Sequence, residues 1–312
     1  MGYAFDPELA AAIEMLPNVD LTDIVKARAE FEALIAQLPS ADTTGLTITD
    51  LTVPAPDGAP DLPLRIYVPD RQAGPVGIYD VHGGGFVLGS IQMMHAGNAA
   101  LARATGAVVV SVDYRLAPEH PYPAGLEDSY TGLVWFVEHA ADYGVDPDRI
   151  AIHGISAGGG LCAGLALLAR DRGGPSIAFQ YLGVPEVDDR LVTPSMRRFT
   201  DTPMWSQPKA VISWDAYLGA GVPGSPDVPV YAAPARATDL SGLPPAYVSA
   251  MEFDPLRDES IAYALALQAA GVQVELHVYP GTFHGSGLVE HAAVSKRETE
   301  EAYTVLRKAL RV

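Results

Sequence analysis

Cysteine is almost missing from this chain. Cys162 is the single cysteine among 312 residues, so no disulfide can form within the chain. The cysteine content therefore gives no sign of an oxidising compartment. Cys162 lies in an apolar stretch, and we expect it to be a small core residue rather than a second nucleophile.

Positive charge is also scarce. The chain has 20 Lys and Arg residues against 38 Asp and Glu residues, which gives a net charge of −18. A surface this negative repels phosphate backbones and anionic lipids. We therefore expect neither a nucleic acid nor a membrane as a partner.

Long apolar runs and a targeting segment are missing as well. The longest apolar stretches, such as 161–169, are far shorter than the roughly 20 residues that span a bilayer. The N-terminal residues lack the basic segment and apolar segment of a signal peptide. These features predict a cytoplasmic protein.

What the chain does contain is an alternation of short β-rich runs and helical stretches. Such alternation is typical of an α/β fold, with a mostly parallel sheet covered by helices on both faces. The two earliest runs are not separated by a helix, which indicates an antiparallel start to the sheet. The predicted strands are 46–53, 62–68, 76–81, 107–112, 149–153, 177–183, 246–251 and 273–279, and the predicted helices are 7–38 in two segments, 92–104, 125–141, 157–170, 257–270 and 292–310.

Residues 190–244 interrupt this alternation. Proline, tryptophan and tyrosine are frequent there, and a strand pattern is missing. Together with the N-terminal helices, in about residues 1–44, this segment is expected to form a cap on a single domain that spans 1–312. Trp205 and Trp214 either line a substrate pocket in this cap or only hold the cap on the sheet, and the sequence leaves both open.

The strongest motif is a glycine-rich turn around a serine, Gly-Ile-Ser-Ala-Gly at 154–158. It follows a predicted strand and precedes a predicted helix, which is the context of a nucleophile elbow. Small neighbours let Ser156 occupy a tight turn, and the helix N-terminus favours negative charge that develops there. A glycine-rich turn of a sugar-binding or phosphate-binding protein is the alternative interpretation.

A second glycine run, His-Gly-Gly-Gly-Phe at 82–86, follows an early predicted strand. Two adjacent backbone N–H groups that point at an oxyanion need positions without obstructing side chains. We expect two of Gly83, Gly84 and Gly85, together with the N–H of Ala157, to form an oxyanion hole. A purely structural glycine turn is the alternative.

Asp254 and His284 are the expected partners of the serine. A serine nucleophile needs a base, and the base needs an acid to orient it. Both residues lie where loops leave the carboxyl ends of predicted strands, in the order Ser, Asp, His that α/β hydrolases use. Asp258 and Glu252 are the rival acids, and the other histidines lie at positions that fit less well.

These motifs resemble those of the hormone-sensitive-lipase-like esterases, a family of bacterial α/β hydrolases. The matching stretches are the glycine loop at 82–86, the elbow at 156–159, the acid motif at 254–259 and the His-Gly pair at 284–285. A further family stretch at 113–124 is interpreted as structural, with Arg115 paired to a carboxylate. The resemblance implies an eight-stranded α/β-hydrolase fold with a helical cap.

The sequence departs from this family at two places. Ile155 stands directly before the serine, where the family usually has aspartate, and the stretch 184–188 differs from the usual pattern. Neither departure changes the expected triad.

The resemblance implies a serine carboxylesterase that cleaves small esters of short acyl groups, from acetyl to butyryl, through an acyl-enzyme. We expect no cofactor and no metal, because no His and Asp residues have the spacing of a metal site. A non-catalytic small-molecule receptor on the same fold is one alternative, although such receptors lose the histidine. An acyltransferase or amidase with the same triad is another, and a homodimer is left open.

Overall fold

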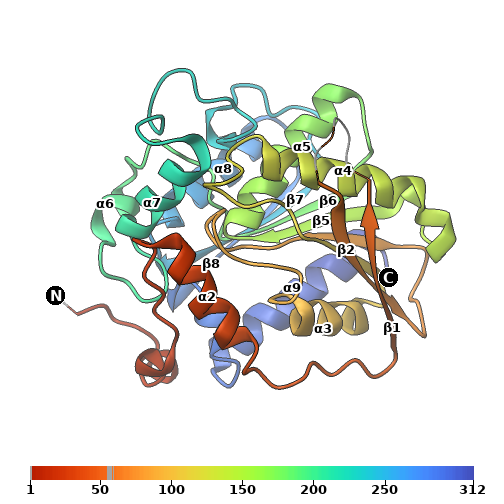
Figure 1. The fold of residues 1–312 in the computed structure, drawn as a ribbon, viewed down its shortest axis with the longest axis horizontal. Helices are drawn as coiled ribbons and strands as arrows, with labels where there is room; N and C mark the ends of the chain where they lie inside the picture. The colour runs from red at the N-terminus through yellow and green to blue at the C-terminus, as the bar shows by residue number, and fades with distance from the viewer. Residues whose placement is uncertain (1, 55–57, 59) are drawn as a thin grey trace.

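The computed structural model describes residues 2–54, 58 and 60–312. In this part of the chain eight strands form one sheet in the order β1-β2-β4-β3-β5-β6-β7-β8 (Figure 1). The predicted eight-stranded α/β-hydrolase sheet is therefore confirmed. The strands are β1 (Leu46–Val53), β2 (Leu62–Pro69), β3 (Gly77–Val81), β4 (Val108–Val112), β5 (Ile150–Ile155), β6 (Phe179–Gly183), β7 (Ala246–Phe253) and β8 (Val274–Phe283).

The sheet begins antiparallel and continues parallel, as the sequence predicts. β1 pairs with β2 and β2 with β4 in antiparallel register, whereas every later pair is parallel. The central strands are buried along their whole length. Because helices cover both faces of such strands, they read as continuous apolar runs such as Val-Val-Val-Ser-Val in β4.

Helices cover both faces of the sheet, and alternate residues of each strand pack against different helices. On β3, Ile78 belongs to the apolar cluster that contains residues of α3 and α9, whereas its neighbour Tyr79 belongs to the cluster that contains residues of α4, α5 and α8. Figure 1 shows the same two layers, with α4, α5 and α8 on one side and α3 and α9 on the other. The helices are α1 (Pro7–Ala10), α2 (Ile24–Ile35), α3 (His95–Thr105), α4 (Ala124–Glu138), α5 (Ala157–Arg172), α6 (Pro194–Arg198), α7 (Gln207–Leu218), α8 (Arg257–Ala269) and α9 (Ala293–Leu310), with 3₁₀ turns at Ile13–Met15, Ala140–Tyr143, Pro147–Arg149, Pro234–Arg236 and Ser286–Leu288.

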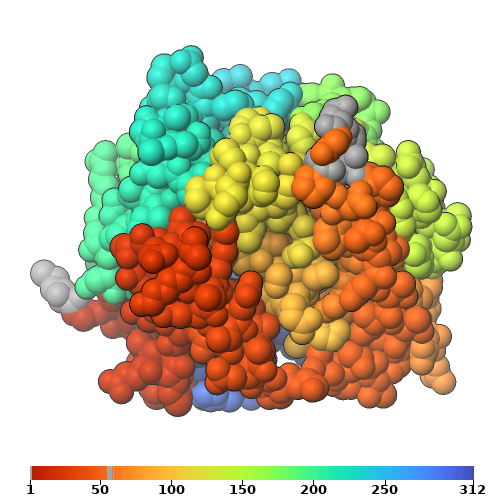
Figure 2. Space-filling view, viewed as in Figure 1, coloured from red at the N-terminus to blue at the C-terminus, as the bar shows by residue number. Residues whose placement is uncertain are grey.

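The segments expected to form a cap are built from short helices. α2 packs with α6 and α7 in one apolar cluster that includes Val87 and Leu88. Arg28 of α2 also donates hydrogen bonds to the carbonyls of Val87 and Ala117, at 2.7 and 2.5 Å. In Figure 2 the N-terminal segment, in red, lies against the chain around α7, in teal. Residue 1 of the expected cap lies outside the described residues.

The last strand is longer than the sequence indicates. β8 continues to Phe283 instead of ending near residue 279. A register shift between Met251 and Phe253 of β7 lets Phe253 pair with Phe283. The amide of Gly281 also donates to the Glu252 carboxylate at 2.7 Å, which ties the extension to β7. Among the helices of the described ranges, none combines the length and the apolar character needed to cross a bilayer.

Candidate active site

Ser156 lies on the turn between β5 and α5, as its motif predicts. Its backbone has φ 61° and ψ −126°, a conformation that L-residues rarely adopt and that stores strain at a functional turn. A Cβ atom on Gly158 would collide with the backbone carbonyls of Val81 and His82. The turn therefore requires glycine there, and it holds the serine at the end of the central strand.

His284 links Ser156 to Asp254. His284 Nε2 lies 2.9 Å from Ser156 Oγ, and His284 Nδ1 lies 2.7 Å from Asp254 Oδ2. Both distances are within reach of proton transfer. Asp254 is fully buried, and its Oδ1 accepts the amide proton of Leu256 at 2.9 Å, which fixes the carboxylate plane. The three predicted residues therefore form one continuous hydrogen-bonded chain.

The sheet explains how the acid and the base meet. Asp254 directly follows β7 and His284 directly follows β8, and these two strands are parallel neighbours. The last residues of the strands, Phe253 and Phe283, are paired in register. The two functional side chains consequently leave the sheet side by side at its carboxyl edge.

The rival acids are engaged elsewhere. Asp258 accepts hydrogen bonds from the amide of Ser195 and the guanidinium of Arg257, at 2.7 and 2.8 Å. Glu252 accepts the amide proton of Gly281. Asp254 is the acid that contacts His284.

The glycine loop at 82–86 lies directly beside the serine. A Cβ atom on Gly83 would be 2.7 Å from the Ile155 carbonyl and 3.4 Å from Ser156 Cβ. Among the hydrogen bonds between described residues, the amides of Gly83, Gly84, Gly85 and Ala157 donate to no backbone acceptor outside regular elements. These N–H groups are therefore available to an oxyanion that forms next to Ser156 Oγ.

The buried side chain of His82 holds the glycine loop in place. It is fully buried and stacks on Tyr114 with ring centroids 4.1 Å apart. Burial lowers the pKa of the His82 imidazole, so the ring is neutral near pH 7. Since a carbonyl only accepts, His82 Nδ1 donates to Gly83 O at 2.8 Å. Tyr114 in turn donates to His82 O at 2.9 Å, which completes the brace.

The two tryptophans have different surroundings. Trp214 is fully buried and packs against Phe86, with ring centroids 5.4 Å apart. The ring centroids of Trp205 and His284 lie 5.8 Å apart. The Trp205 indole also packs against Gly85, where a Cβ atom would collide with it. Trp214 is thus a core residue under the glycine loop, whereas Trp205 lies beside both Gly85 and His284.

The structure also shows the surroundings of three further residues named from the sequence, Arg115, Cys162 and Ile155. Arg115 forms a two-pronged ion pair with Asp128, at 2.8 and 2.7 Å, so the predicted carboxylate partner is confirmed. Cys162 is fully buried in the core, as expected. Ile155, which replaces the usual aspartate, is 41% exposed beside the serine.

The N-terminal segment reaches the strand ends that carry the acid and the base. The Phe5 ring packs edge-on against Phe253 and Phe283, with centroids 5.2 Å from each. The amide of Asp6 donates to Gly281 O at 2.9 Å, and Tyr3 donates its hydroxyl proton to Asp201. These contacts could not be predicted from the sequence, because nothing local in residues 3–6 points to β8.

Replacing Phe5 with alanine should weaken both the fold and the activity. A half-buried phenyl ring is worth about 2 kcal/mol of unfolding free energy, less than the roughly 3–5 kcal/mol of a fully buried Phe→Ala change. Because the ring touches the residues directly before Asp254 and His284, we also expect kcat to fall by roughly threefold to tenfold. Urea unfolding and initial rates measure the two effects.

Tyr143→Ala is the matched control for Phe5→Ala. Tyr143 is another half-buried aromatic residue, packed on Trp135. It should cost similar stability and leave kcat unchanged. Equal losses of kcat in the two variants would show that Phe5 has no special link to the acid and the base.

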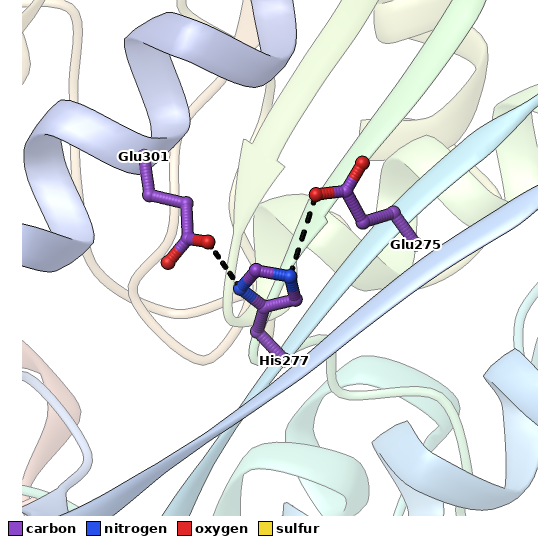
Figure 3. A group of neighbouring side chains, drawn as sticks. All are labelled: Glu275, His277 and Glu301. Atoms are coloured by element: carbon purple, nitrogen blue, oxygen red, sulfur yellow. Dashed lines mark ion pairs between the residues drawn. The ribbon is translucent and has the colours of Figure 1, made fainter.

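One group of described residues has the atoms to hold a metal ion, with one ligand atom each within 4.8 Å of one another. Glu275 and His277 lie on β8 and Glu301 lies on α9 (Figure 3). His277 Nδ1 is 2.5 Å from Glu301 and Nε2 is 3.3 Å from Glu275. Both ring nitrogens therefore already face carboxylates, and the group acts as an ion-pair cluster that joins α9 to the edge strand.

Comparison with known proteins gives consistent results. A family model described as the alpha/beta hydrolase fold matches residues 78–287. The solved structure of a bacterial heroin esterase superposes with a TM-score of 0.96 at 51% identity, covering 99% of each chain. Carboxylesterase NlhH of Mycobacterium tuberculosis is 44% identical over 289 residues, which cover 90% of this chain and 88% of that protein. Esterase LipI of the same species is 39% identical over 303 residues, with 95% and 92% covered.

Proposed function

This chain belongs to the hormone-sensitive-lipase-like family of α/β hydrolases and is a carboxylic ester hydrolase, and we propose that it cleaves small esters of short acyl groups with Ser156, His284 and Asp254. The observation that carries the proposal is the hydrogen-bonded chain from Asp254 through His284 to Ser156, with distances of 2.7 and 2.9 Å. Such a chain suits covalent acyl transfer.

In the proposed first step, His284 Nε2 takes the proton of Ser156 Oγ while the oxygen attacks the ester carbonyl. Asp254 holds the imidazole with its proton on Nδ1 and stabilises the imidazolium that forms. The imidazolium then gives its proton to the leaving alcohol. Water repeats the sequence on the acyl-enzyme and releases the acid.

The tetrahedral intermediate carries its negative charge on the former carbonyl oxygen. We propose that the N–H of Ala157 and two N–H groups among Gly83, Gly84 and Gly85 stabilise it. The N-terminus of α5 adds a favourable dipole at the same place. Donors fixed before the reaction are effective because they do not reorganise as charge develops.

A short acyl group is supported by the segments proposed as a cap, 1–44 and 190–244. Helix α6 has only five residues and α7 has twelve, and the segment that holds them contains many prolines. Proline fixes φ and ends helices, so this cap is stiff and Trp205 narrows the space beside His284. The heroin esterase and arylesterase names among the relatives fit small acyl esters.

Chain length is the test of this substrate class. Each added methylene gains about 0.8 kcal/mol by burial, but an acyl chain that overruns a closed pocket meets steric costs of about 1–3 kcal/mol. The kcat/KM values for 4-nitrophenyl esters should peak between acetate and butyrate and decline by octanoate. Efficient hydrolysis of emulsified long-chain triglyceride would contradict the proposal.

Acyl transfer to an alcohol, or amide cleavage, would use the same residues. Rates on matched acetanilide and phenyl acetate, and product analysis with added alcohol, separate these activities from hydrolysis. Hydrolysis is favoured because the bacterial heroin esterase, carboxylesterase NlhH and esterase LipI are all named as esterases.

A further inference from the structure

Asp80 is a fully buried acid that the mechanism above does not use. It lies on β3, two residues before the glycine loop at 82–86, and its side chain has no exposed surface. The strand register places it opposite both Ser111 of β4 and His153 of β5. A buried carboxylate is costly unless hydrogen-bond donors surround it, so the donors around Asp80 show which parts of the fold this acid connects.

Three donors from three different elements satisfy the Asp80 carboxylate. His153 Nδ1 lies 2.7 Å from Oδ1. Asn98 Nδ2 of α3 and Ser111 Oγ lie 2.7 and 3.1 Å from Oδ2. Because a carboxylate only accepts, each of these groups donates to it. The His153 ring also stacks on Tyr181, with centroids 4.7 Å apart, so the imidazole itself is held in place. Asp80 therefore joins β3 to β4, β5 and α3.

These hydrogen bonds enclose the segment that carries the proposed oxyanion donors. The chain leaves Asp80, forms the glycine loop and returns in α3, where Asn98 donates back to Asp80. This bond closes the segment at its base. On the neighbouring strand, His153 lies three residues before Ser156. One carboxylate thus connects the loop that supplies the donors to the strand that supplies the nucleophile.

The loop and the elbow are in such close contact that a shift of one strand would disturb both. β3 and β5 are paired in register along the whole of β3. A Cβ atom on Gly83 would be 2.7 Å from the Ile155 carbonyl oxygen. A Cβ atom on Gly158 would collide with the Val81 carbonyl. A displacement of β3 along β5 would therefore move the loop N–H groups relative to the serine oxygen.

We propose that Asp80 is a positioning residue for ester hydrolysis: through Asn98 and His153 it fixes the oxyanion loop relative to the elbow. This inference rests on the proposed roles of Ser156 and of the loop at 83–85. Donors to an oxyanion are effective because they are in place before the charge develops, and a misplacement of about 1 Å costs on the order of 10²-fold in rate. Loss of the hydrogen bonds to Asp80 therefore lowers kcat and leaves KM nearly unchanged.

The first test replaces Asp80 with leucine, which has a similar shape and accepts no hydrogen bond. Asp80→Leu should lower kcat for 4-nitrophenyl acetate by about tenfold to 100-fold, with KM within about threefold of the wild type. Active sites are titrated to completion with paraoxon and each rate is divided by their concentration, so that unfolded protein does not contribute to the loss.

A transition-state analogue gives a second readout on the same variant. A trifluoromethyl ketone adds to the serine oxygen and places a negatively charged oxygen where the loop N–H groups point. Its inhibition constant should rise in Asp80→Leu by about the same factor as kcat/KM falls, because the analogue and the transition state use the same donors. A purely structural role of Asp80 would leave the inhibition constant of the titrated sites unchanged.

An exchange of donor and acceptor decides the question if Asp80→Leu folds poorly. Asn98→Asp alone places a second carboxylate against Asp80 and should lower kcat per active site at least about tenfold. In the double variant Asp80→Asn/Asn98→Asp, the amide at position 80 donates to the carboxylate at position 98 and to Ser111, and its oxygen accepts from His153. All the hydrogen bonds are restored, so kcat should return to within about threefold of the wild type.

Gln180→Leu is the matched control for Asp80→Leu. Gln180 is another fully buried polar residue of the sheet, and its side-chain amide donates to Pro244 O at 2.8 Å. It lies in the amino half of β6, away from the strand ends that carry the site. Its replacement should lower the unfolding free energy and leave kcat and inhibitor affinity per active site as in the wild type.

Three results would overturn the positioning role of Asp80. They are an unchanged kcat per active site in Asp80→Leu, a double variant that recovers no activity relative to Asn98→Asp, and an equal loss of kcat in Gln180→Leu, which would trace the effect to stability. A Ser156→Ala variant that keeps its activity would instead overturn the proposed function, so the two failures are distinguishable.

Discussion

Replacing Ser156 with alanine is expected to lower kcat by about 10⁵–10⁶, as for other enzymes that lose the nucleophile of a triad. The reason is structural. The elbow between β5 and α5 holds the Ser156 hydroxyl beside the glycine loop, with Oγ 2.9 Å from His284 Nε2. Without that oxygen, only the oxyanion donors and substrate binding are left to accelerate attack by water.

Initial rates on 4-nitrophenyl acetate measure the loss, and circular dichroism checks that the variant is folded. Ser176→Ala, at an exposed serine, is the control and should retain full activity. Phenylmethylsulfonyl fluoride should add one group to the wild type, at Ser156, and none to Ser156→Ala. Labelling of another serine, together with retained activity in the alanine variant, would show that the nucleophile is misassigned.

Asp254→Asn is expected to lower kcat by about 10⁴. The Leu256 amide bonds to one side-chain oxygen of residue 254, so an asparagine would keep its carbonyl there and turn its NH₂ group toward His284 Nδ1. The imidazole would then carry its proton on Nε2, where it faces Ser156 Oγ. In that tautomer it cannot accept the serine proton.

Asp258→Asn is the matched control for this change. Asp258 lies four residues further along and bonds to the Ser195 amide and to Arg257. Its replacement should cost some stability and less than about tenfold in kcat. Rates for both variants at several pH values decide the question, and a reversed order of the two effects would identify Asp258 as the orienting acid.

The features that could be predicted from sequence are those with local causes. The elbow is one, since a serine between small residues at a strand-to-helix junction has few other conformations. The positions of Asp254 and His284 follow from the same logic, because parallel strands deliver their following residues to one edge. Apolar runs such as β4 identify the buried strands without any knowledge of their neighbours.

The features that could not be predicted depend on contacts between distant parts of the chain. Ser213 meets Gly85 across 128 residues of sequence, and no pattern in either segment indicates the other. The packing of Phe5 on Phe283 is of the same kind. The extension of β8 through Gly281 could not be predicted because proline and glycine normally end a strand, whereas here Glu252 and the N-terminal segment hold it in place.

The strand order places Ser156 and His284 after strands of different stability. Ser156 follows a strand that is hydrogen-bonded on both sides, whereas His284 follows β8, the outermost strand, which is bonded to β7 alone. Local opening starts where protection is lowest. A molecule whose outer strand has frayed still holds Ser156 in its turn but lacks the imidazole that we propose activates it. The rate at which activity is lost on storage or heating is therefore set by opening of the edge strand β8. Substitutions meant to prolong activity should stabilise the contacts between residues 3–6 and β8 rather than the well-packed centre of the sheet.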